Sequence, residues 1–229
     1  IVDIPTISLI IEEALAAGIE EIIVVNNRKK QSLENYFSLD IDLENELRKN
    51  NKESLALLVR DIATKVKVTF VYQDEAKGLG HAILMAKEAV GNQPFAILLG
   101  DDIVVSSDKP AIGQLMDCYH HHQKAVVGVQ TVALNDVSKY GMIAKEDTDW
   151  ERTYRVTAMV EKPTQATTPS RLAILGRYVL TPDIFAYLET QTPGKGGEIQ
   201  ITDAIARLME AQGVYAYDFE GRRYDVGDR

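Results

Sequence analysis

The stretch Phe95-Ala96-Ile97-Leu98-Leu99-Gly100-Asp101-Asp102 decides the fold class, because five apolar residues run unbroken to a glycine and two carboxylates follow at once. An apolar run of this length is typical of a parallel strand covered on both faces of an α/β sheet. Ligands of such sheets gather beyond the carboxyl ends of the strands, which is where Asp101 and Asp102 would stand. Adjacent carboxylates repel each other unless a cation such as Mg²⁺, a basic side chain or several hydrogen-bond donors offset them. A strand end followed by an Asp-capped turn is the purely structural alternative.

The segments around this strand alternate between helical and strand patterns. Residues 6–17 carry apolar side chains at helical spacing, with Pro5 suited to the first turn and Gly18 to the C-terminal cap. Between residues 30 and 64 the pattern favours two or three exposed, charged helices. Further strands are expected at residues 21–26, 67–71, 95–99, 125–132, 141–145, 154–161, 172–180 and 214–219, and further helices at 82–90, 110–124, 182–189 and 198–211. The pattern predicts an α/β fold with a Rossmann-like mixed, mostly parallel sheet flanked by helices, and antiparallel members in the second half.

The bulk composition limits the classes of protein to consider. A chain of 229 residues with 45% hydrophobic residues can bury a large core within one domain. The formal net charge of -9 argues against a nucleic-acid partner, since no basic stripe stands out. No stretch approaches membrane-spanning length, and the one cysteine fits a reducing cytoplasm. We therefore expect a cytoplasmic protein without a nucleic-acid or membrane partner.

The loop Gln73-Asp74-Glu75-Ala76-Lys77-Gly78-Leu79-Gly80-His81-Ala82 joins a predicted strand to a predicted helix through two closely spaced glycines. Such a turn lets backbone amides approach a ligand, and a helix N-terminus favours anions. The loop matches neither a Walker A motif nor a complete dinucleotide fingerprint, so a tight connection without a ligand is an equal alternative. The amide of Gln73 can donate and accept at once, as the reading of a nucleobase edge requires.

Two further segments place charged residues at predicted strand ends or turns. Val160-Glu161-Lys162-Pro163 ends a strand with an acid, a base and a residue that forbids continuation. Adjacent strand residues point to opposite faces, so Glu161 and Lys162 can serve one ligand only if the strand ends there. Tyr224-Asp225-Val226-Gly227-Asp228 adds a carboxylate near the end of the sequence. A solvated ion pair and a turn aspartate are the respective structural alternatives.

Two other features are interpreted as structural. His120-His121-His122 resembles a metal tract by composition only, and we interpret it as a solvated helix face. Cys118 on the same predicted helix lacks neighbouring catalytic residues in the sequence, which favours a packed thiol over a nucleophile.

Taken together, the segments resemble the bacterial UDP-glucose pyrophosphorylase family, the UTP:glucose-1-phosphate uridylyltransferases, within the sugar-nucleotidyltransferase fold. The resemblance runs nearly from end to end. It is carried, in chain order, by Ile1-Val2-Asp3-Ile4-Pro5-Thr6-Ile7, Lys77-Gly78-Leu79-Gly80-His81-Ala82, Leu99-Gly100-Asp101-Asp102, Lys139-Tyr140-Gly141-Met142-Ile143, Val160-Glu161-Lys162-Pro163, Leu175-Gly176-Arg177-Tyr178, Gly197-Glu198-Ile199-Gln200-Ile201-Thr202-Asp203-Ala204 and Tyr224-Asp225-Val226-Gly227-Asp228.

The resemblance implies transfer of a uridylyl group from UTP to α-D-glucose 1-phosphate, giving UDP-glucose and pyrophosphate, with Mg²⁺ as the cofactor. Such a reaction depends on positioning and charge neutralisation, so Lys162, Asp101 and Mg²⁺ would act without a covalent nucleophile. The implied roles are Gln73 and Gly78 against the uracil, Asp101 and Asp225 as metal ligands, Gly141, Glu161 and Gly176 against the glucose, and Lys162 against the sugar phosphate. Asp102 is the less secure ligand of the opening pair.

The chain also departs from the family pattern. Members begin with a central strand and a Gly-x-Gly-Thr-Arg type turn with a downstream lysine, and they end in helices used for subunit contacts. Neither is present, and Ile4 stands where relatives usually carry lysine. Without the central strand the sheet would keep a gap with unpaired backbone groups and exposed apolar sides. We therefore expect residues 1–229 to form one nucleotidyltransferase domain, incomplete at both ends, of a protein that is homo-oligomeric when full length.

Within this domain, residues 1–135 would form mainly the nucleotide-binding half and residues 136–229 mainly the sugar-binding half. The 229-residue chain by itself is expected to make no UDP-glucose. Two other functions stay open at this point. One is transfer of a thymidylyl or other nucleotidyl group to a sugar 1-phosphate, and the other is a non-catalytic, regulatory protein that binds a sugar nucleotide.

Overall fold

The computed structural model describes residues 5–30, 33–34, 37, 41–54, 56–57 and 66–227. Its strands are β1 (Glu21–Asn26), β2 (Lys67–Tyr72), β3 (Phe95–Leu98), β4 (Asp102–Val105), β5 (Val126–Thr131), β6 (Gly141–Asp147), β7 (Thr153–Glu161), β8 (Leu172–Leu180), β9 (Tyr215–Asp218) and β10 (Arg222–Asp225). Its helices are α1 (Thr6–Ala16), α3 (Ile41–Lys49), α5 (Leu79–Met85), α6 (Lys87–Val90), α7 (Ala111–His122), α8 (Ile184–Glu189) and α9 (Ile201–Gln212), with short 3₁₀ turns η1 (Leu134–Lys139) and η2 (Lys195–Gly197). None of these helices is both long enough and apolar enough to cross a membrane.

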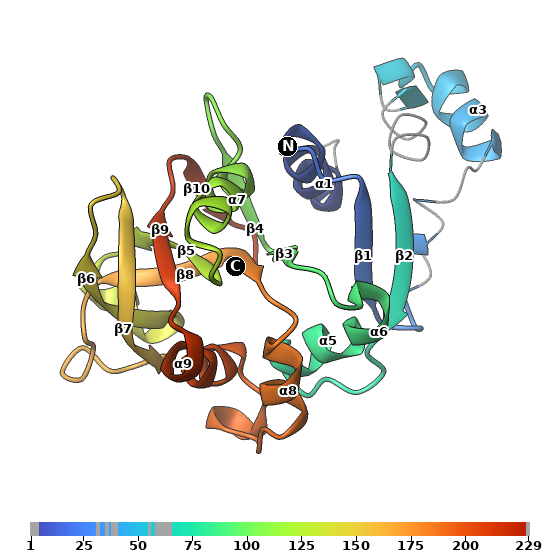
Figure 1. Cartoon of the computed structure of the whole chain (residues 1–229). Coiled ribbons are helices and arrows are strands. Elements are labelled where there is room, and N and C mark those ends of the chain that lie inside the picture. Colours follow the sequence, from blue (N-terminus) through green and yellow to red (C-terminus); the bar gives the residue numbers. More distant parts are fainter. Residues whose placement is uncertain are drawn as a thin grey trace.

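The main sheet has the strand order β3-β8-β5-β9-β7-β6. Strands β5 and β9 pair in parallel, whereas β8 pairs antiparallel with both β3 and β5. Strands β1 and β2 form a separate parallel pair, and β4 and β10 form an antiparallel pair (Figure 1). The predicted mixed α/β fold with flanking helices is confirmed, but the expected predominance of parallel pairing is not found among the described strands. Parallel pairing among the described strands is confined to β1–β2 and β5–β9, because β8 returns between β3 and β5 and separates two strands that run in the same direction.

Helices cover both faces of the main sheet. One core contains apolar side chains of α5, α8 and α9, and the other contains those of α7. Strands β8 and β9 from the second half of the chain lie beside β3 and β5 from the first half. The two expected halves therefore share one sheet. The assignment of nucleotide binding to one half and sugar binding to the other stays a prediction.

Most expected elements are present, some with the predicted bounds. Residues 21–26 and 172–180 form β1 and β8 without a shift at either end. The helix expected at residues 82–90 begins earlier, at Leu79, and is divided into α5 and α6 at Ala86. Of the helices expected between residues 30 and 64, α3 is described, and much of the remainder lies outside the described residues. Strands β4 and β10 were not predicted, because both are short and their pairing joins segments far apart in the sequence.

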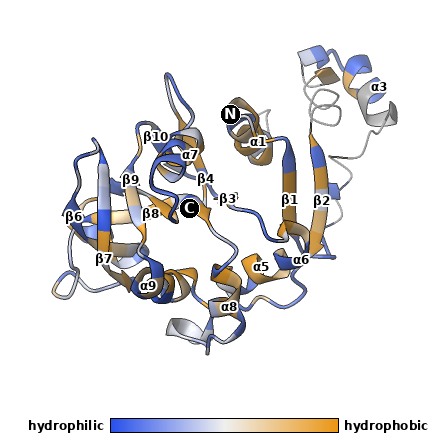
Figure 2. Cartoon of the chain, viewed as in Figure 1, coloured by the Kyte–Doolittle hydropathy of each residue, from blue (hydrophilic) through white to orange (hydrophobic). Residues whose placement is uncertain are grey.

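An apolar cavity of about 980 Å³ lies between β1 and β3. Among the described strands, β1 pairs only with β2, and β3 pairs only with β8, so one edge of each strand has no ladder partner there. Figure 2 shows β1 and β2 largely in the apolar colour. Apolar strands with unpaired edges are costly, and the incompleteness of the domain stays a prediction.

Candidate active site

The candidate site lies where β8 changes its partner along one edge. Residues 177–180 of β8 pair with β3, whereas Ala173 pairs with β6. A cavity of about 460 Å³ opens at this change of partner. Most of the residues singled out in the sequence line it, namely Asp101, Gly141, Glu161, Lys162, Gly176 and Asp225. The fold therefore brings together the expected metal ligands, the expected sugar contacts and the expected phosphate-binding lysine.

Asp101 and Asp225 flank the small residue Gly227. A Cβ added to Gly227 would lie 3.4 Å from Asp101 Oδ2 and 3.5 Å from Asp225 Oδ1, so the two carboxylates lie close together. The backbone fixes both segments, since Val226 N donates to Asp101 O at 2.9 Å and Gly227 N donates to Asp225 Oδ1 at 3.0 Å. Carboxylate oxygens are the ligands that a small divalent cation takes in proteins.

Asp102, the second member of the opening pair, faces Arg223 instead. Arg223 Nε donates to Asp102 Oδ1 at 2.5 Å, and another guanidinium nitrogen donates to Asp225 Oδ2 at 2.9 Å. Asp102 is 6% exposed, and burial raises the pKa of its carboxyl above the ordinary value even though the charge of Arg223 opposes the shift. Arg223 was not among the candidate residues predicted from the sequence. The alternation of Arg223 and Asp225 on one face of a strand was the available signal.

Gly176 is required by the approach of Asp102. Its φ of 52° lies in the left-handed region, and a Cβ at this position would lie 2.5 Å from Asp102 Oδ2. A glycine is the one residue that accepts both conditions without strain. The resemblance assigns Gly176 to the glucose, and the structure adds a packing reason for the same residue.

A buried ion pair supports Gly176 and Asp102 from behind. Arg177 is fully buried, and its guanidinium donates to Glu13 of α1 at 2.6 to 3.1 Å. The same guanidinium donates to the backbone oxygens of Gly176 at 3.0 Å and of Asp102 at 2.8 Å. Glu13 Oε1 also accepts from Ile112 N at 3.1 Å. Helices α1 and α7 are thereby tied to the back of the cavity.

Glu161 is held at the end of β7 by two neighbours. It stands opposite Gly141 in the β6–β7 register, and Thr202 Oγ1 donates to its Oε2 atom at 2.6 Å. A Cβ on Gly141 would lie 2.9 Å from Thr202 Oγ1 and 3.2 Å from Glu161 Oε2. The glycine therefore leaves the space in which the threonine reaches the carboxylate.

Lys162 shows that β7 ends where the sequence predicts. Its φ of 46° turns the chain out of the extended conformation directly after Glu161, and its backbone N donates to Tyr140 O at 3.0 Å. Lys162 Nζ lies 3.7 Å from Glu161 Oε1. Consecutive residues of a regular strand would point to opposite faces, so the turn lets both line one cavity.

Gln73 and Gly78 lie together but outside this cavity. Gln73 Nε2 donates to Gly78 O at 3.1 Å and contacts His81 Nδ1 at 2.9 Å. Gln73 lines the apolar cavity between β1 and β3. The structure thus places the two residues assigned to uracil beside each other, while the cavity at β8 holds the others.

The glycines of the 73–82 loop serve a close backbone contact. Gly80 N donates to Ile199 O at 2.8 Å, and Ile199 N donates to Lys77 O at 2.8 Å. A Cβ on Gly78 or on Gly80 would lie 2.9 Å or 2.7 Å from Ile199 O. The amide of Gly80 is therefore engaged by the chain itself, which favours the tight-connection alternative over a phosphate loop for this residue.

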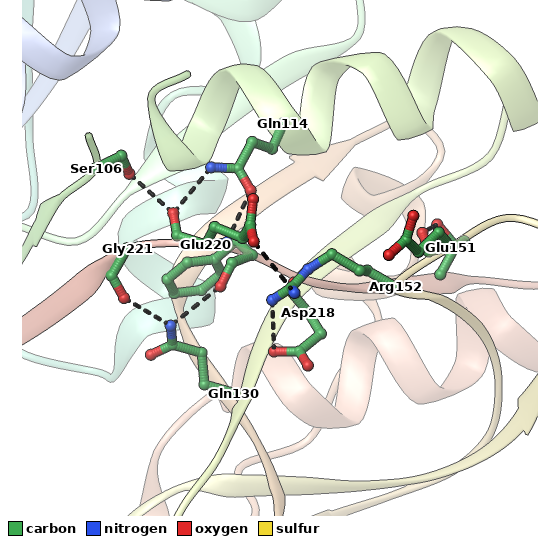
Figure 3. A network of polar contacts seen from close by, with 10 residues as sticks. Ser106, Gln114, Gln130, Glu151, Arg152, Asp218, Glu220 and Gly221 are labelled. Atoms are coloured by element: carbon green, nitrogen blue, oxygen red, sulfur yellow. Dashed lines mark hydrogen bonds and ion pairs between the residues drawn. The ribbon is translucent and has the colours of Figure 1, made fainter. Parts of the chain in front are cut away.

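The turn between β9 and β10 is fixed by side chains from distant elements (Figure 3). Gln114 of α7 accepts from Glu220 N at 2.8 Å and donates to Glu220 O at 2.9 Å, much as a neighbouring strand would. Gln130 of β5 donates to the backbone oxygens of Phe219 at 3.1 Å and Gly221 at 2.9 Å. Because β10 begins directly after this turn, the network fixes the strand that carries Arg223.

Of the residues interpreted as structural, Cys118 fits the interpretation and His122 does not. Cys118 is buried, and burial raises the pKa of its thiol to about 12, as expected for a packed thiol. The interpretation of the histidine tract as a solvated face is wrong for His122. Its ring stacks on Tyr215 with centroids 3.9 Å apart, and its Nε2 is buried without a hydrogen-bond partner. Packing of α7 against β9 draws this side chain inward.

The donor set at the site suits Mg²⁺ better than a metal that needs a complete protein cage. Among the residues that the structure describes, no group of three or more His, Cys, Asp or Glu side chains gathers for a metal. Asp101 and Asp225 would then be the protein donors. Mg²⁺ commonly takes one or two carboxylates together with water and substrate phosphates, and the pair Asp101 and Asp225 is compatible with this coordination.

Comparison with known proteins assigns the class. The sequence profile of the family described as "Nucleotidyl transferase" matches residues 1–229, and the chain belongs to this family. A UTP--glucose-1-phosphate uridylyltransferase of Staphylococcus epidermidis is 52% identical over 229 residues, which cover all of this chain and 79% of that protein. The structure also resembles two solved structures. They are a UDP-glucose pyrophosphorylase complexed with UDP-glucose (43% identity, TM-score 0.91, 99% of this chain and 83% of that chain) and a UTP-bound UGPase from Acinetobacter baumannii (37% identity, TM-score 0.87, 99% and 79%).

Proposed function

We propose that this chain transfers a uridylyl group from UTP to α-D-glucose 1-phosphate, giving UDP-glucose and pyrophosphate. The observation that carries the proposal is the convergence of Asp101, Asp225, Glu161 and Lys162 on one cavity at the change of partner of β8. The relatives named for this reaction and the solved relatives with UDP-glucose or UTP support it. An enzyme is thereby favoured over a sensor that only binds a sugar nucleotide.

The residues of the cavity divide the chemistry between them. In the reaction, an oxygen of the sugar phosphate attacks the α-phosphorus of UTP, and the bond to the β-phosphate oxygen breaks as pyrophosphate leaves. Lys162 would neutralise the sugar phosphate, and Glu161 would accept hydrogen bonds from glucose hydroxyls, with Gly141 and Gly176 leaving room for the sugar. Bound Mg²⁺, held by Asp101 and Asp225, would supply positive charge against the phosphates.

The proposed contact of Gln73 and Gly78 with uracil depends on which polar atoms of the Gln73 amide are already engaged. The nitrogen of the Gln73 amide already donates to Gly78 O. The amide oxygen is an acceptor, and a nucleobase with an imino N–H is a suitable donor to it. Gln73 would therefore read a base through its oxygen while Gly78 keeps the amide in place.

The gap between β1 and β3 bears on activity as well as on fold. We propose that one further strand, contributed by sequence preceding residue 1, fills the apolar cavity there and completes the nucleotide-binding half. This fits the prediction that the 229-residue chain alone makes no UDP-glucose. Assembly as a homo-oligomer and a cytoplasmic location likewise stay predictions.

The test compares nucleotides in a protein that carries this chain and the preceding segment. Pyrophosphate release is measured with UTP or dTTP, with and without glucose 1-phosphate and Mg²⁺. We expect pyrophosphate release that needs the nucleotide, glucose 1-phosphate and Mg²⁺ together and is faster with UTP than with dTTP. A strong preference for dTTP would contradict uridylyl transfer, and binding of UDP-glucose without any turnover would favour the regulatory alternative.

A further inference from the structure

The shortest polar contact of the Glu161 carboxylate comes from helix α9. Thr202 Oγ1 donates to Glu161 Oε2 at 2.6 Å. Thr202 is 5% exposed, and the Glu161 side chain is 12% exposed. A hydrogen bond from a hydroxyl to a carboxylate is short and strong compared with one between neutral groups.

We propose that Thr202 is a positioning residue for sugar recognition, which acts by holding the Glu161 carboxylate in one orientation. The inference rests on the proposed function, because it takes Glu161 as the group that meets the glucose hydroxyls. With Oε2 tied to Thr202, the carboxylate presents Oε1 on the side of Lys162, whose Nζ lies 3.7 Å from it. Sugar and phosphate would then meet neighbouring groups of fixed geometry.

Local structure places the threonine hydroxyl firmly. Thr202 lies in the first turn of α9, and the segment just before this helix is clamped through both backbone bonds of Ile199 to the 77–80 loop. On the other side, Gly141 leaves the space for the contact, since a Cβ there would lie 2.9 Å from Thr202 Oγ1. The backbone just before Thr202 is thus fixed, whereas the glutamate side chain has three rotatable bonds, whose orientation the hydrogen bond from Thr202 would limit.

The contact has no evident task in capping α9. The N-cap of this helix is Gln200, which makes no side-chain capping hydrogen bond. Thr202 Oγ1 points instead across to the end of β7. Losing the hydroxyl would therefore change the orientation of Glu161 more than the helix that carries Thr202.

The experiment uses the protein that carries this chain and the preceding segment, with two probes, glucose 1-phosphate and inorganic phosphate, and binding measured by calorimetry. The wild type is expected to bind glucose 1-phosphate more tightly than phosphate. Thr202→Val keeps the shape of the side chain and removes the donor, and it should lower that preference on the order of tenfold while phosphate binding at Lys162 is unchanged. Thr202→Ser keeps the hydroxyl and should restore the preference.

A double-mutant cycle separates positioning through Glu161 from a general structural effect. In a Glu161→Gln background, Thr202→Val should cause little further loss, because the group on which it acts has already been changed. Thermal unfolding of each variant serves as the folding control, and Thr202→Ala provides a second hydroxyl-free variant if Thr202→Val is poorly folded. A hydroxyl-free variant that keeps the wild-type preference overturns the role of Thr202. A wild type with no preference for the sugar phosphate overturns the proposed sugar site, and the inference with it.

Discussion

The adjacent carboxylates Asp101 and Asp102 have different surroundings. Asp101 is exposed to the cavity beside Gly227, whereas Asp102 is buried against Arg223. Two neighbouring carboxylates need a partner that offsets their repulsion, and in the structure the basic side chain of Arg223 does so for Asp102. The other, Asp101, is a proposed ligand of Mg²⁺.

Asp101→Asn is expected to lower turnover by orders of magnitude in the protein that carries the preceding segment, because it removes one of two proposed metal ligands. The assay is pyrophosphate release at saturating UTP and glucose 1-phosphate across a range of Mg²⁺ concentrations. Asp108→Asn, in an exposed position of the following loop, is the matched control and should leave turnover unchanged. Full activity of Asp101→Asn would remove this residue from the mechanism.

Arg223→Met is expected to lower the free energy of unfolding by about 3 kcal/mol or more, because it leaves the buried Asp102 carboxylate without its partner. Urea unfolding followed by circular dichroism measures the change. Arg222→Met, on the same strand but exposed, should cost far less. Adding Asp102→Asn to Arg223→Met should recover part of the loss. A destabilisation equal to that of Arg222→Met would show that the pair contributes little.

At the scale of elements, β8 shows which features can be predicted from the sequence and which cannot. Its unbroken apolar run predicted the strand with both ends correct, and all nine of its residues are buried. The left-handed turn at Gly176 could not be predicted, because it accompanies the approach of Asp102 from β4. The change of partner from β3 to β6 could not be predicted either, because it joins segments far apart in the sequence. The candidate residues came from motifs and, for Gly141 and Gly176, from the family resemblance alone. Arg223 and Thr202 were missed, because their roles arise only when β10 and α9 pack against other elements.

The C-terminal end of α7 predicts a pH dependence of stability. Burial, followed by the nearby His121, lowers the pKa of His122 below its ordinary value of 6.5. A histidine with a lowered folded-state pKa stabilises the fold in its neutral form, so this contribution is present above about pH 6.5 and is lost as the pH falls. His122→Phe keeps a ring against Tyr215 and should flatten the dependence of the urea midpoint on pH. The exposed His120, changed to Phe, should leave the wild-type slope, and an equal flattening by both variants would contradict the account.

At the scale of the whole molecule, Gln73, assigned to the base, and the residues assigned to the sugar line different cavities. Gln73 lines the apolar cavity of about 980 Å³, whereas Glu161 and Lys162 line the cavity of about 460 Å³. A strand in the gap between β1 and β3 would connect the two regions and pair both free edges. The 229-residue chain is accordingly expected to release no pyrophosphate from UTP and glucose 1-phosphate, while the protein with the preceding segment does. Turnover by the chain alone would contradict the need for that strand.

The most direct test of the central claim is a crystal structure of the protein in complex with UDP-glucose and Mn²⁺, with the metal located by its anomalous signal. We expect glucose hydroxyls on Glu161, a phosphate on Lys162 and manganese between Asp101 and Asp225. Glucose and phosphate bound away from the cavity at the change of partner of β8, or manganese bound without either carboxylate, would contradict this expectation.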